Sequence, residues 1–218
     1  MDETGHEDFA DPNYPVFGLG GCAIPAMAID ENLTLPWRAL KDLHFGGADN
    51  PLHAADLRSP TKTQLEALGS FFVGRPFGRF AVTMTVKTKL PSGMVPYEIL
   101  PNMLRRRWEE LASRVQPTPT EVALIHEASQ RGDRLLERYF GPTHIYVNGN
   151  PVKVHHGIMP KSSAEALEVA DFIVHAAGGQ ALARAKGRGG FRKDFRAVFQ
   201  ANSLWSSYVD VNAVSANV

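Results

Sequence analysis

The first 24 residues, MDETGHEDFADPNYPVFGLGGCAI, contain the pattern that decides the fold. Residues 14–24 are apolar and rich in glycine, and Pro25 follows them, so they predict a strand with close backbone neighbours and not the start of a helix. The short stretch around Asp2 predicts a partner strand, and residues 6–13, rich in Asp and Pro, predict the turn between the two. We therefore expect the chain to open with a β-hairpin.

The rest of the chain alternates between helix-like and strand-like patterns. Helices are predicted at five places: 30–44, 61–73, 97–115, 131–140 and 163–185. Strands are predicted at four further places: 79–88, 121–129, 143–147 and 151–156. This order of elements predicts a mixed α/β fold. A chain of 218 residues, 44% of them hydrophobic, can bury one sizeable core, so we expect a single domain spanning 1–218, with a basic segment at 184–196 and a C-terminal tail.

The predicted strands differ in how they are expected to be buried. Residues 79–88 alternate apolar side chains with smaller or polar ones, which is typical of a strand with one buried face. Residues 121–129 hold a continuous apolar run, which is typical of a central strand covered on both faces. Asn148 and Gly149 separate the last two strands, and this pair favours the tight turn of a hairpin.

Composition narrows the cellular setting. Cys22 is the only cysteine, which excludes an intramolecular disulfide and a cysteine-based zinc cluster and leads us to expect the cytoplasm. No apolar run approaches the roughly 20 residues that a membrane span needs, so we expect a soluble protein without a membrane partner. Lys and Arg together number 23, as do Asp and Glu, so a nucleic-acid partner would have to be held by a local basic patch.

Charge is nevertheless distributed unevenly along the chain. Five acidic residues lie near the start: Asp2, Glu3, Glu7, Asp8 and Asp11. Six basic residues lie in a late segment: Arg184, Lys186, Arg188, Arg192, Lys193 and Arg196. The late segment also holds Phe191 and Phe195, so it combines cations that can contact phosphates with rings that can stack on a base. The pattern predicts a nucleic-acid-binding segment, and a solvated loop with an apolar anchor in the core is the alternative.

Two acids lie where a metal site would need them. Phosphodiester hydrolysis with paired metal ions requires several carboxylates that converge from different elements, and strand ends of an open α/β sheet face a common crevice. Glu127 ends the apolar run of a predicted strand, and Asp171 lies at the margin of the apolar stripe of the helix predicted at 163–185. An acid that emerges into solvent as the strand stops is the alternative for Glu127.

The remaining candidate residues are weaker by position alone. Asp2 and Glu3 lie at the start of the chain, where a frayed, solvated terminus is the alternative interpretation. Glu168 and His175 lie on the same side of the late helix as Asp171, at spacings of three and four residues. These two either join the site or form a solvated edge, and the solvated edge is favoured for His175.

Six stretches carry a resemblance to a known family. They are DETG at the start, VFGLGGCAI in the second strand, the W-x-x-L-K of Trp37 to Lys41, PLHAADL with His53, IHEAS with Glu127, and LEVADFIVHAAG with Asp171. Together they resemble a large family of bacterial and phage proteins, a domain of unknown function whose members open with D-E-S/T-G. The likeness extends along most of the chain, and the opening and the L-x-x-A-D helix are its most specific pieces.

The resemblance implies a ribonuclease H-like fold, in which helices flank a mixed central sheet. In that superfamily an acid on the first strand, one near the end of the fourth strand and one on a late helix bind magnesium or manganese. Carried over to this sequence, the resemblance implies Asp2, Glu127 and Asp171 as catalytic metal ligands. It implies Glu3 as a further ligand or a structural residue.

The start of the late helix and the start of the chain lead to two further expectations. Lys161 and Ser163 lie where the late helix begins, and neither is expected to be catalytic. Only Met1 precedes Asp2, whereas a central first strand normally has several apolar residues before its acid. An earlier start of the chain is therefore expected.

Two functions follow as hypotheses. The first is a nuclease or related phosphotransfer enzyme that uses Mg²⁺ or Mn²⁺, with Asp2, Glu127 and Asp171 as ligands and water as the nucleophile. The second is a non-catalytic module that binds nucleic acid or protein on the same fold. The basic segment, with Arg184, Lys186, Arg188, Arg192 and Lys193 as nucleic-acid contacts, serves either hypothesis.

Overall fold

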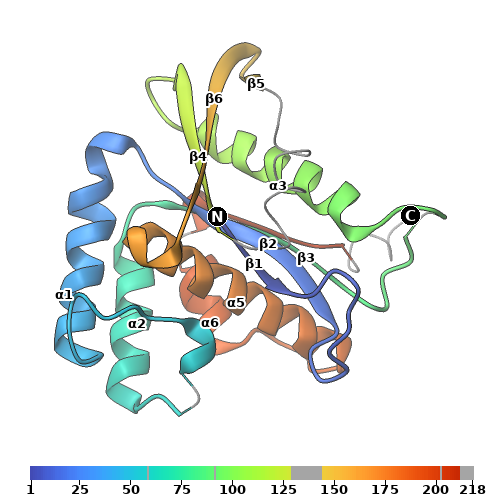
Figure 1. The fold of residues 1–218 in the computed structure, drawn as a ribbon, viewed down its shortest axis with the longest axis horizontal. Coiled ribbons are helices and arrows are strands. Elements are labelled where there is room, and N and C mark those ends of the chain that lie inside the picture. Colours follow the sequence, from blue (N-terminus) through green and yellow to red (C-terminus); the bar gives the residue numbers. More distant parts are fainter. Residues whose placement is uncertain (58, 91, 129–143, 202, 212–218) are drawn as a thin grey trace.

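The computed structural model of the protein describes residues 1–57, 59–90, 92–128, 144–201 and 203–211. Its fold is mixed α/β, as the sequence predicted, with two mixed sheets flanked by helices (Figure 1). The helix predicted at 131–140 lies outside the described residues.

The first sheet contains the predicted opening hairpin. Its four strands, in spatial order, are β1 (Asp2–Gly5), β2 (Val16–Ala23), β3 (Gly78–Thr85) and β7 (Ser206–Asp210). β2 runs antiparallel to both neighbours, and β7 runs parallel to β3. The register places Asp2 opposite Gly20, so the first acid lies at the open end of the hairpin, away from its turn.

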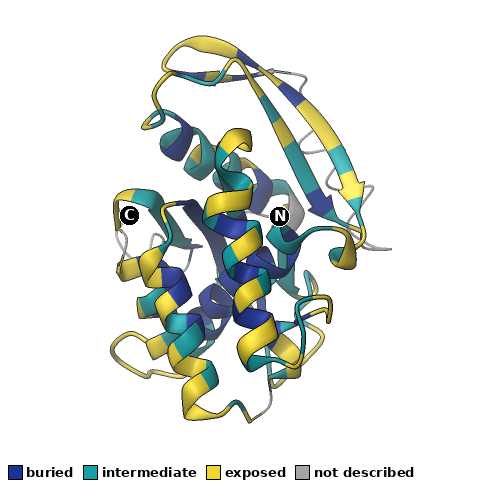
Figure 2. Ribbon diagram, turned by 90° about the vertical axis from the view of Figure 1, so that its left-hand side faces the viewer, coloured by how far each residue is buried: buried dark blue, intermediate teal, exposed yellow. Residues whose placement is uncertain are grey.

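The second sheet is formed by β4 (Glu121–Glu127), β6 (Asn150–Met159) and β5 (His144–Val147), in that spatial order. β4 and β6 are parallel, and β5 and β6 form the predicted antiparallel hairpin. Asn148 and Gly149 both adopt positive φ at its turn, at 52° and 80°, which is the conformation that this residue pair favours. β4 and β6 extend away from the body of the protein (Figures 1 and 2).

Met1 joins the two sheets. Its amino group donates a hydrogen bond of 2.7 Å to the Ile125 carbonyl, and its own carbonyl accepts one of 3.0 Å from the Glu127 N–H. Bonds from one residue to the two residues that flank His126 have the pattern of a parallel ladder. Met1 is buried, so Asp2 follows an anchored residue and does not lie on a frayed end.

In chain order, the helical segments are η1 (Ala26–Ala28), η2 (Asp30–Thr34), α1 (Leu35–His44), η3 (Ala54–Asp56), α2 (Lys62–Gly74), α3 (Pro96–Ala112), η4 (Lys161–Ser163), α5 (Glu165–Ala185), α6 (Lys193–Phe195), η5 (Arg196–Gln200) and η6 (Ser203–Trp205). The predictions at 30–44, 61–73, 97–115 and 163–185 match described helices closely, whereas the short segments η1, η3, α6, η5 and η6 were not predicted. α2 begins with a capping box, in which Thr61 Oγ1 accepts from the Gln64 N–H and Gln64 Oε1 accepts from the Thr61 N–H. None of the helices in the described residues is long and apolar enough to cross a membrane.

Helices cover both faces of the first sheet, and each face has its own core (Figure 1). On one face, α3 packs through Leu100 and Leu104 against Phe17 and Phe80. On the other face, α1, α2 and α5 enclose an aromatic cluster around Trp37, whose ring lies 4.9 Å from Phe71 and 5.3 Å from Phe172. The rings meet edge to face, the arrangement that aromatic pairs prefer.

Two expectations of strand burial are wrong. β3 is buried along its whole length and not on one face only, because α3 and α5 cover its two sides. β4 is not covered on both faces, since Glu121 and Ala123 are exposed and Val122 and Leu124 are only half-buried. The reason is that α3 covers only one face of the second sheet, through Trp108 and Ala112, whereas Glu121 and Ala123 of β4 point to the solvent-exposed face.

α5 is the central helix and packs closely on the opening hairpin. It is buried on nearly all sides between Leu167 and Ala181, whereas the sequence predicted an apolar stripe with a polar side. The close approach requires Gly178, because a Cβ added there would lie 2.1 Å from Tyr14 Oη and 2.8 Å from Thr4 Cγ2. Thr4 and Tyr14 hydrogen-bond to each other through their hydroxyls at 3.0 Å, so neither is free to move aside cheaply.

Gly178→Ala should lower the free energy of unfolding by roughly 1–3 kcal/mol, because the clash exceeds the gain in helix propensity. Gly69 in α2 is the matched control, since nothing lies within 4 Å of the position that a Cβ would take there, and Gly69→Ala should stabilise by roughly 0.5–1 kcal/mol. Urea unfolding of both variants measures this. Equal effects of the two substitutions would contradict the packing described for α5.

Candidate functional site

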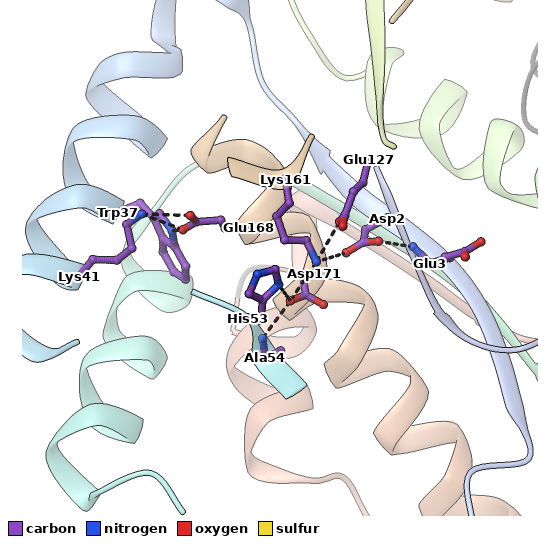
Figure 3. Close-up of polar contacts among 10 residues, drawn as sticks. All are labelled: Asp2, Glu3, Trp37, Lys41, His53, Ala54, Glu127, Lys161, Glu168 and Asp171. Carbon is purple, nitrogen blue, oxygen red and sulfur yellow. Dashed lines mark hydrogen bonds and ion pairs between the residues drawn. The ribbon is translucent and has the colours of Figure 1, made fainter. Parts of the chain in front are cut away.

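Three carboxylates from three elements gather around one ammonium group (Figure 3). Lys161 Nζ lies 2.8 Å from Glu127 Oε2, 3.2 Å from Asp2 Oδ2 and 3.4 Å from Asp171 Oδ2. Asp2 comes from the start of β1, Glu127 from the end of β4, Asp171 from α5 and Lys161 from η4. The structure therefore brings together the three acids that the resemblance implied. We call these four residues the carboxylate cluster.

The local structure explains how these side chains meet. The Met1 bonds to β4 set the first residues of β1 beside the last residues of β4. The parallel register pairs Glu127 with Met159, and the chain then turns at Pro160 so that Lys161 follows close to Glu127. η4 is a tight turn, held by a 2.9 Å hydrogen bond from the Ser163 N–H to the Pro160 carbonyl.

Asp171 is positioned by the loop between α1 and α2. The backbone N–H of Ala54 donates a hydrogen bond of 2.9 Å to Asp171 Oδ2. His53 Nδ1 lies 3.9 Å from the same oxygen, and the His53 side chain is partly exposed. This is the loop that carries the PLHAADL stretch of the sequence. It closes the cluster on the side opposite β4 (Figure 3).

Burial dominates the electrostatics of the cluster. The side chain of Asp2 is 8% exposed, and burial raises its pKa to about 6, with Lys161 opposing and Glu127 adding to the shift. Burial alone would lower the pKa of Lys161, but Asp2, Asp171 and Glu127 together raise it above its ordinary value. The Lys161 ammonium therefore stays charged, whereas the Asp2 carboxyl takes up a proton more readily than a solvated aspartate does.

Two oxygens of the cluster lack directed hydrogen bonds. Within the described part of the chain, Asp2 Oδ2 and Glu127 Oε2 are buried and accept none of good geometry. Lys161 approaches both at ion-pair distance, so it compensates their charge without fully satisfying them as acceptors. Buried acceptors of this kind are uncommon in native proteins, and a catalytic role or a bound ion is one explanation for them.

The donor set fits a hard divalent cation in type. Carboxylate oxygens are the ligands that Mg²⁺ and Mn²⁺ prefer, and three of them face one point. In the arrangement seen, however, no three acidic, histidine or cysteine side chains of the described residues converge closely enough to hold an ion, and Lys161 occupies the middle of the cluster. Asp2, Glu127 and Asp171 could hold a metal only if Lys161 gave way.

The structure does not bring Glu3 into the cluster. Successive side chains of a strand point to opposite faces, so Glu3 points away when Asp2 points in. Figure 3 shows the Glu3 carboxylate directed away from Lys161. Its backbone N–H instead donates a 2.7 Å hydrogen bond to Asp2 Oδ1, which favours the ionised carboxylate. Of the two roles expected for Glu3, the geometry supports the structural one.

Glu168 is buried and does not form a solvated edge of α5. Lys41 Nζ lies 3.0 Å from Glu168 Oε2, and both side chains are almost fully buried. Trp37 Nε1 donates a 2.6 Å hydrogen bond to the same carboxylate. The pair ties α1 to α5 three residues before Asp171, so Glu168 supports the site without joining it. His175, one turn after Asp171, is half-buried.

The basic segment at 184–196 is partly neutralised within the protein. Arg184 pairs with the buried Asp210 at 3.5 Å, and Arg192 pairs with Asp194 at 2.8 Å. Arg188 is exposed and forms no ion pair with any acidic side chain of the described residues. Among the residues predicted to contact nucleic acid, Arg184 and Arg192 are thus partly neutralised by acidic side chains, whereas Arg188 is not.

The two lysines of the segment also differ in whether they contact other groups of the protein. Lys186 Nζ reaches the Asn13 carbonyl at 3.5 Å, and Lys193 is exposed. Phe195 is buried, and its ring stacks on that of Phe191 with 5.4 Å between the ring centroids. Phe191 is 39% exposed and lines an open cleft with Arg184 and Tyr208. The apolar anchor of the alternative interpretation is therefore present in Phe195.

Lys161 is the residue of the cluster that sequence reasoning missed. The sequence placed it at the start of the late helix and did not expect it to act at the site. A signal was available, because three carboxylates that converge in a buried place require a positive charge beside them. That requirement does not say which lysine or arginine supplies the charge.

Asp2→Asn should change how stability depends on pH. Between pH 3.8 and about 6, folded Asp2 keeps a proton that the unfolded chain releases, so the contribution of Asp2 to the free energy of unfolding falls as pH rises. A pKa change from 3.8 to about 6 corresponds to roughly 3 kcal/mol. Urea unfolding should show Asp2→Asn gaining up to about that much relative to wild type from pH 4 to pH 7. A difference that does not vary with pH would contradict the assigned burial of Asp2.

Comparisons with known proteins found no relative of this chain. No known protein family, no curated protein and no solved structure matches the chain. What the protein does therefore has to be argued from the carboxylate cluster and its surroundings.

Proposed function

We propose that this protein is a phosphodiester hydrolase, a nuclease of ribonuclease H-like type that depends on Mg²⁺ or Mn²⁺. The observation that carries the proposal is the convergence of Asp2, Glu127 and Asp171 on one point from three separate elements. Convergent carboxylates are what a metal-dependent phosphodiester hydrolase needs. Clusters of buried like charges otherwise weaken a fold, so their presence favours a functional reason.

The arrangement of the strands supports the proposed fold type. β1 is the edge strand of the first sheet, and Met1, directly before it, pairs with the end of β4. This pairing brings the start of β1 toward the central place that the resemblance implies for the strand with the first acid. Glu127 is the last residue of β4, and Asp171 lies on the late helix α5. These placements, on the first strand, at the end of the fourth strand and on a late helix, support the proposed ribonuclease H-like type.

The proposed roles follow from the chemistry of each side chain. Asp2, Glu127 and Asp171 would hold the cation, and the backbone N–H of Ala54 keeps Asp171 oriented. A bound divalent ion lowers the pKa of water and stabilises charge that develops on a phosphate. Lys161 supplies a permanent positive charge next to the three acids.

Nucleic acid is the proposed partner. The basic segment supports this, with Arg188 and Lys193 as its most available cations. The chain has no net charge, so binding would depend on this local patch and would weaken steeply with salt.

A non-catalytic binding module is the second candidate. Two observations favour it: Lys161 already compensates the charge of the acids, and the described residues hold no ready-made metal site. A protein that had lost catalysis could retain this arrangement as a structural ion cluster. Cleavage assays separate the two candidates.

Cleavage should require the acids of the cluster. With Mg²⁺ or Mn²⁺, the wild type is expected to cut at least one of single-stranded, double-stranded or hybrid nucleic acid. Asp171→Asn and Glu127→Gln should each lower the rate by about 100-fold or more, because metal stabilisation contributes several kcal/mol. Asp56→Asn is the matched control, an exposed carboxylate in η3 next to the site, and should cut as the wild type does. Equal rates in all four proteins would sink the assigned site.

Binding should depend on salt through the basic segment. Arg188→Ala with Lys193→Ala should reduce the slope of log affinity against log salt by about 0.7–0.9 for each phosphate that the variant no longer neutralises. Arg106→Ala removes an exposed charge from α3, on the other side of the sheet, and should leave the slope unchanged. Fluorescence anisotropy with a labelled oligonucleotide at several salt concentrations gives these slopes. An unchanged slope in the double variant would exclude the segment as the binding surface.

A further inference from the structure

Lys161 is held in its place by more than its charge. η4 follows Pro160 directly and is closed by the hydrogen bond from the Ser163 N–H to the Pro160 carbonyl. The side chain of Lys161 is 12% exposed, so its four-carbon stem is packed and its ammonium is largely removed from water. A lysine fixed at both its backbone and its ammonium is a built feature of the site.

The ammonium occupies the position that a metal ion would need. It is within 3.4 Å of an oxygen from each of Asp2, Glu127 and Asp171, and it is the centre on which the three side chains converge. Without a positive charge at this point, the three carboxylates would repel one another, and at least one would have to take up a proton. A divalent cation placed among the same oxygens would meet repulsion from the ammonium.

We propose that Lys161 is an internal counter-ion, which holds the three carboxylates together in the metal-free protein and is displaced from them when a divalent cation binds. The proposal rests on the metal dependence proposed above, and it identifies Lys161 as the group that competes with the metal ion for the three carboxylates. Once displaced, the ammonium lies at the edge of the cluster, where it is a positive charge available to an anionic substrate. Lys161 is therefore a positioning residue in the metal-free state and a substrate contact in the loaded one.

The first experiment measures Mn²⁺ binding to the whole chain by calorimetry at pH 7.5. Lys161→Met keeps the length of the side chain and removes its charge, so Mn²⁺ should bind at least about tenfold tighter than to wild type. Lys161→Arg keeps the charge and should stay close to wild type. Lys153→Met removes an exposed charge from β6 and should change nothing. Affinity that is unchanged or weaker in Lys161→Met would overturn the proposal.

The second experiment uses the wild-type chain and so avoids any loss of folding in the variants. Amine labelling by reductive methylation, followed by mass spectrometry, reports how accessible each lysine is. Labelling of Lys161 should be slow without metal and should become several-fold faster with Mn²⁺, since the ammonium leaves the carboxylates. Lys153 serves as the internal reference, with a rate that does not respond. A Lys161 rate that Mn²⁺ leaves unchanged or lowers would show that the lysine stays in place, against the proposal.

These measurements separate the counter-ion from the nuclease activity. Tighter Mn²⁺ binding by Lys161→Met, together with no cleavage of any nucleic acid by the wild type, would support the counter-ion and reject the proposed function. Cleavage by the wild type with Mn²⁺ affinity unaltered in Lys161→Met would do the reverse. If neither protein binds Mn²⁺, the internal counter-ion is rejected together with the metal site.

Discussion

Two backbone hydrogen bonds between Met1 and β4 are the constraint on which the site depends. They join two sheets that otherwise share no ladder among the described strands, and they set the first residue of β1 beside the last residues of β4. Asp2 and Glu127 meet only because of this junction. The parallel register of β4 with β6 then brings Lys161 to the same place, and α5, packed on the glycine-containing hairpin, adds Asp171.

The cluster is a compromise between charge and burial. Three acids in a nearly dry place would not all stay ionised, and the pKa of Asp2, raised to about 6, shows the direction of the conflict. Lys161 reduces the conflict without removing it, because two of the acid oxygens have an ion-pair partner and no directed hydrogen bond within the described part of the chain. Such incomplete compensation is what the proposed exchange of the Lys161 ammonium for a divalent cation would require, because a fully satisfied network would resist it.

Sequence patterns predicted much of the fold, because the signals were local. The Gly-rich run before Pro25, the turn at Asn148 and Gly149 and the apolar spacing of the helices each concern residues that are neighbours in the chain. The three acids of the cluster were also named in advance, although two of them needed the family resemblance to be preferred over a solvated position. Their meeting at one point is a property of the folded chain.

Most of the misses have a different cause, since they depend on residues far apart in sequence. Lys161 meets acids from three other elements, and Lys41 meets Glu168 across 127 positions, so no local pattern indicates either pairing. The exposure of β4 follows from the covering of only one face of the second sheet by α3, and an apolar run cannot report that. The separation of Glu3 from Asp2 is different, because strand alternation is a local property that directs neighbouring side chains to opposite faces.

The buried pair of Lys41 and Glu168 has an evolutionary consequence. Lys41 and Glu168 compensate each other's charge, and the Trp37 Nε1–H donates a hydrogen bond to the Glu168 carboxylate. A neutral substitution of either charged residue would therefore leave the other charge buried without its ion-pair partner. Such a step is strongly unfavourable on its own, while the paired exchange of both residues is tolerable. In any lineage that descends from this protein, the two positions should drift together, and a sequence in which only one has changed should carry a compensating change at Trp37 or beside it.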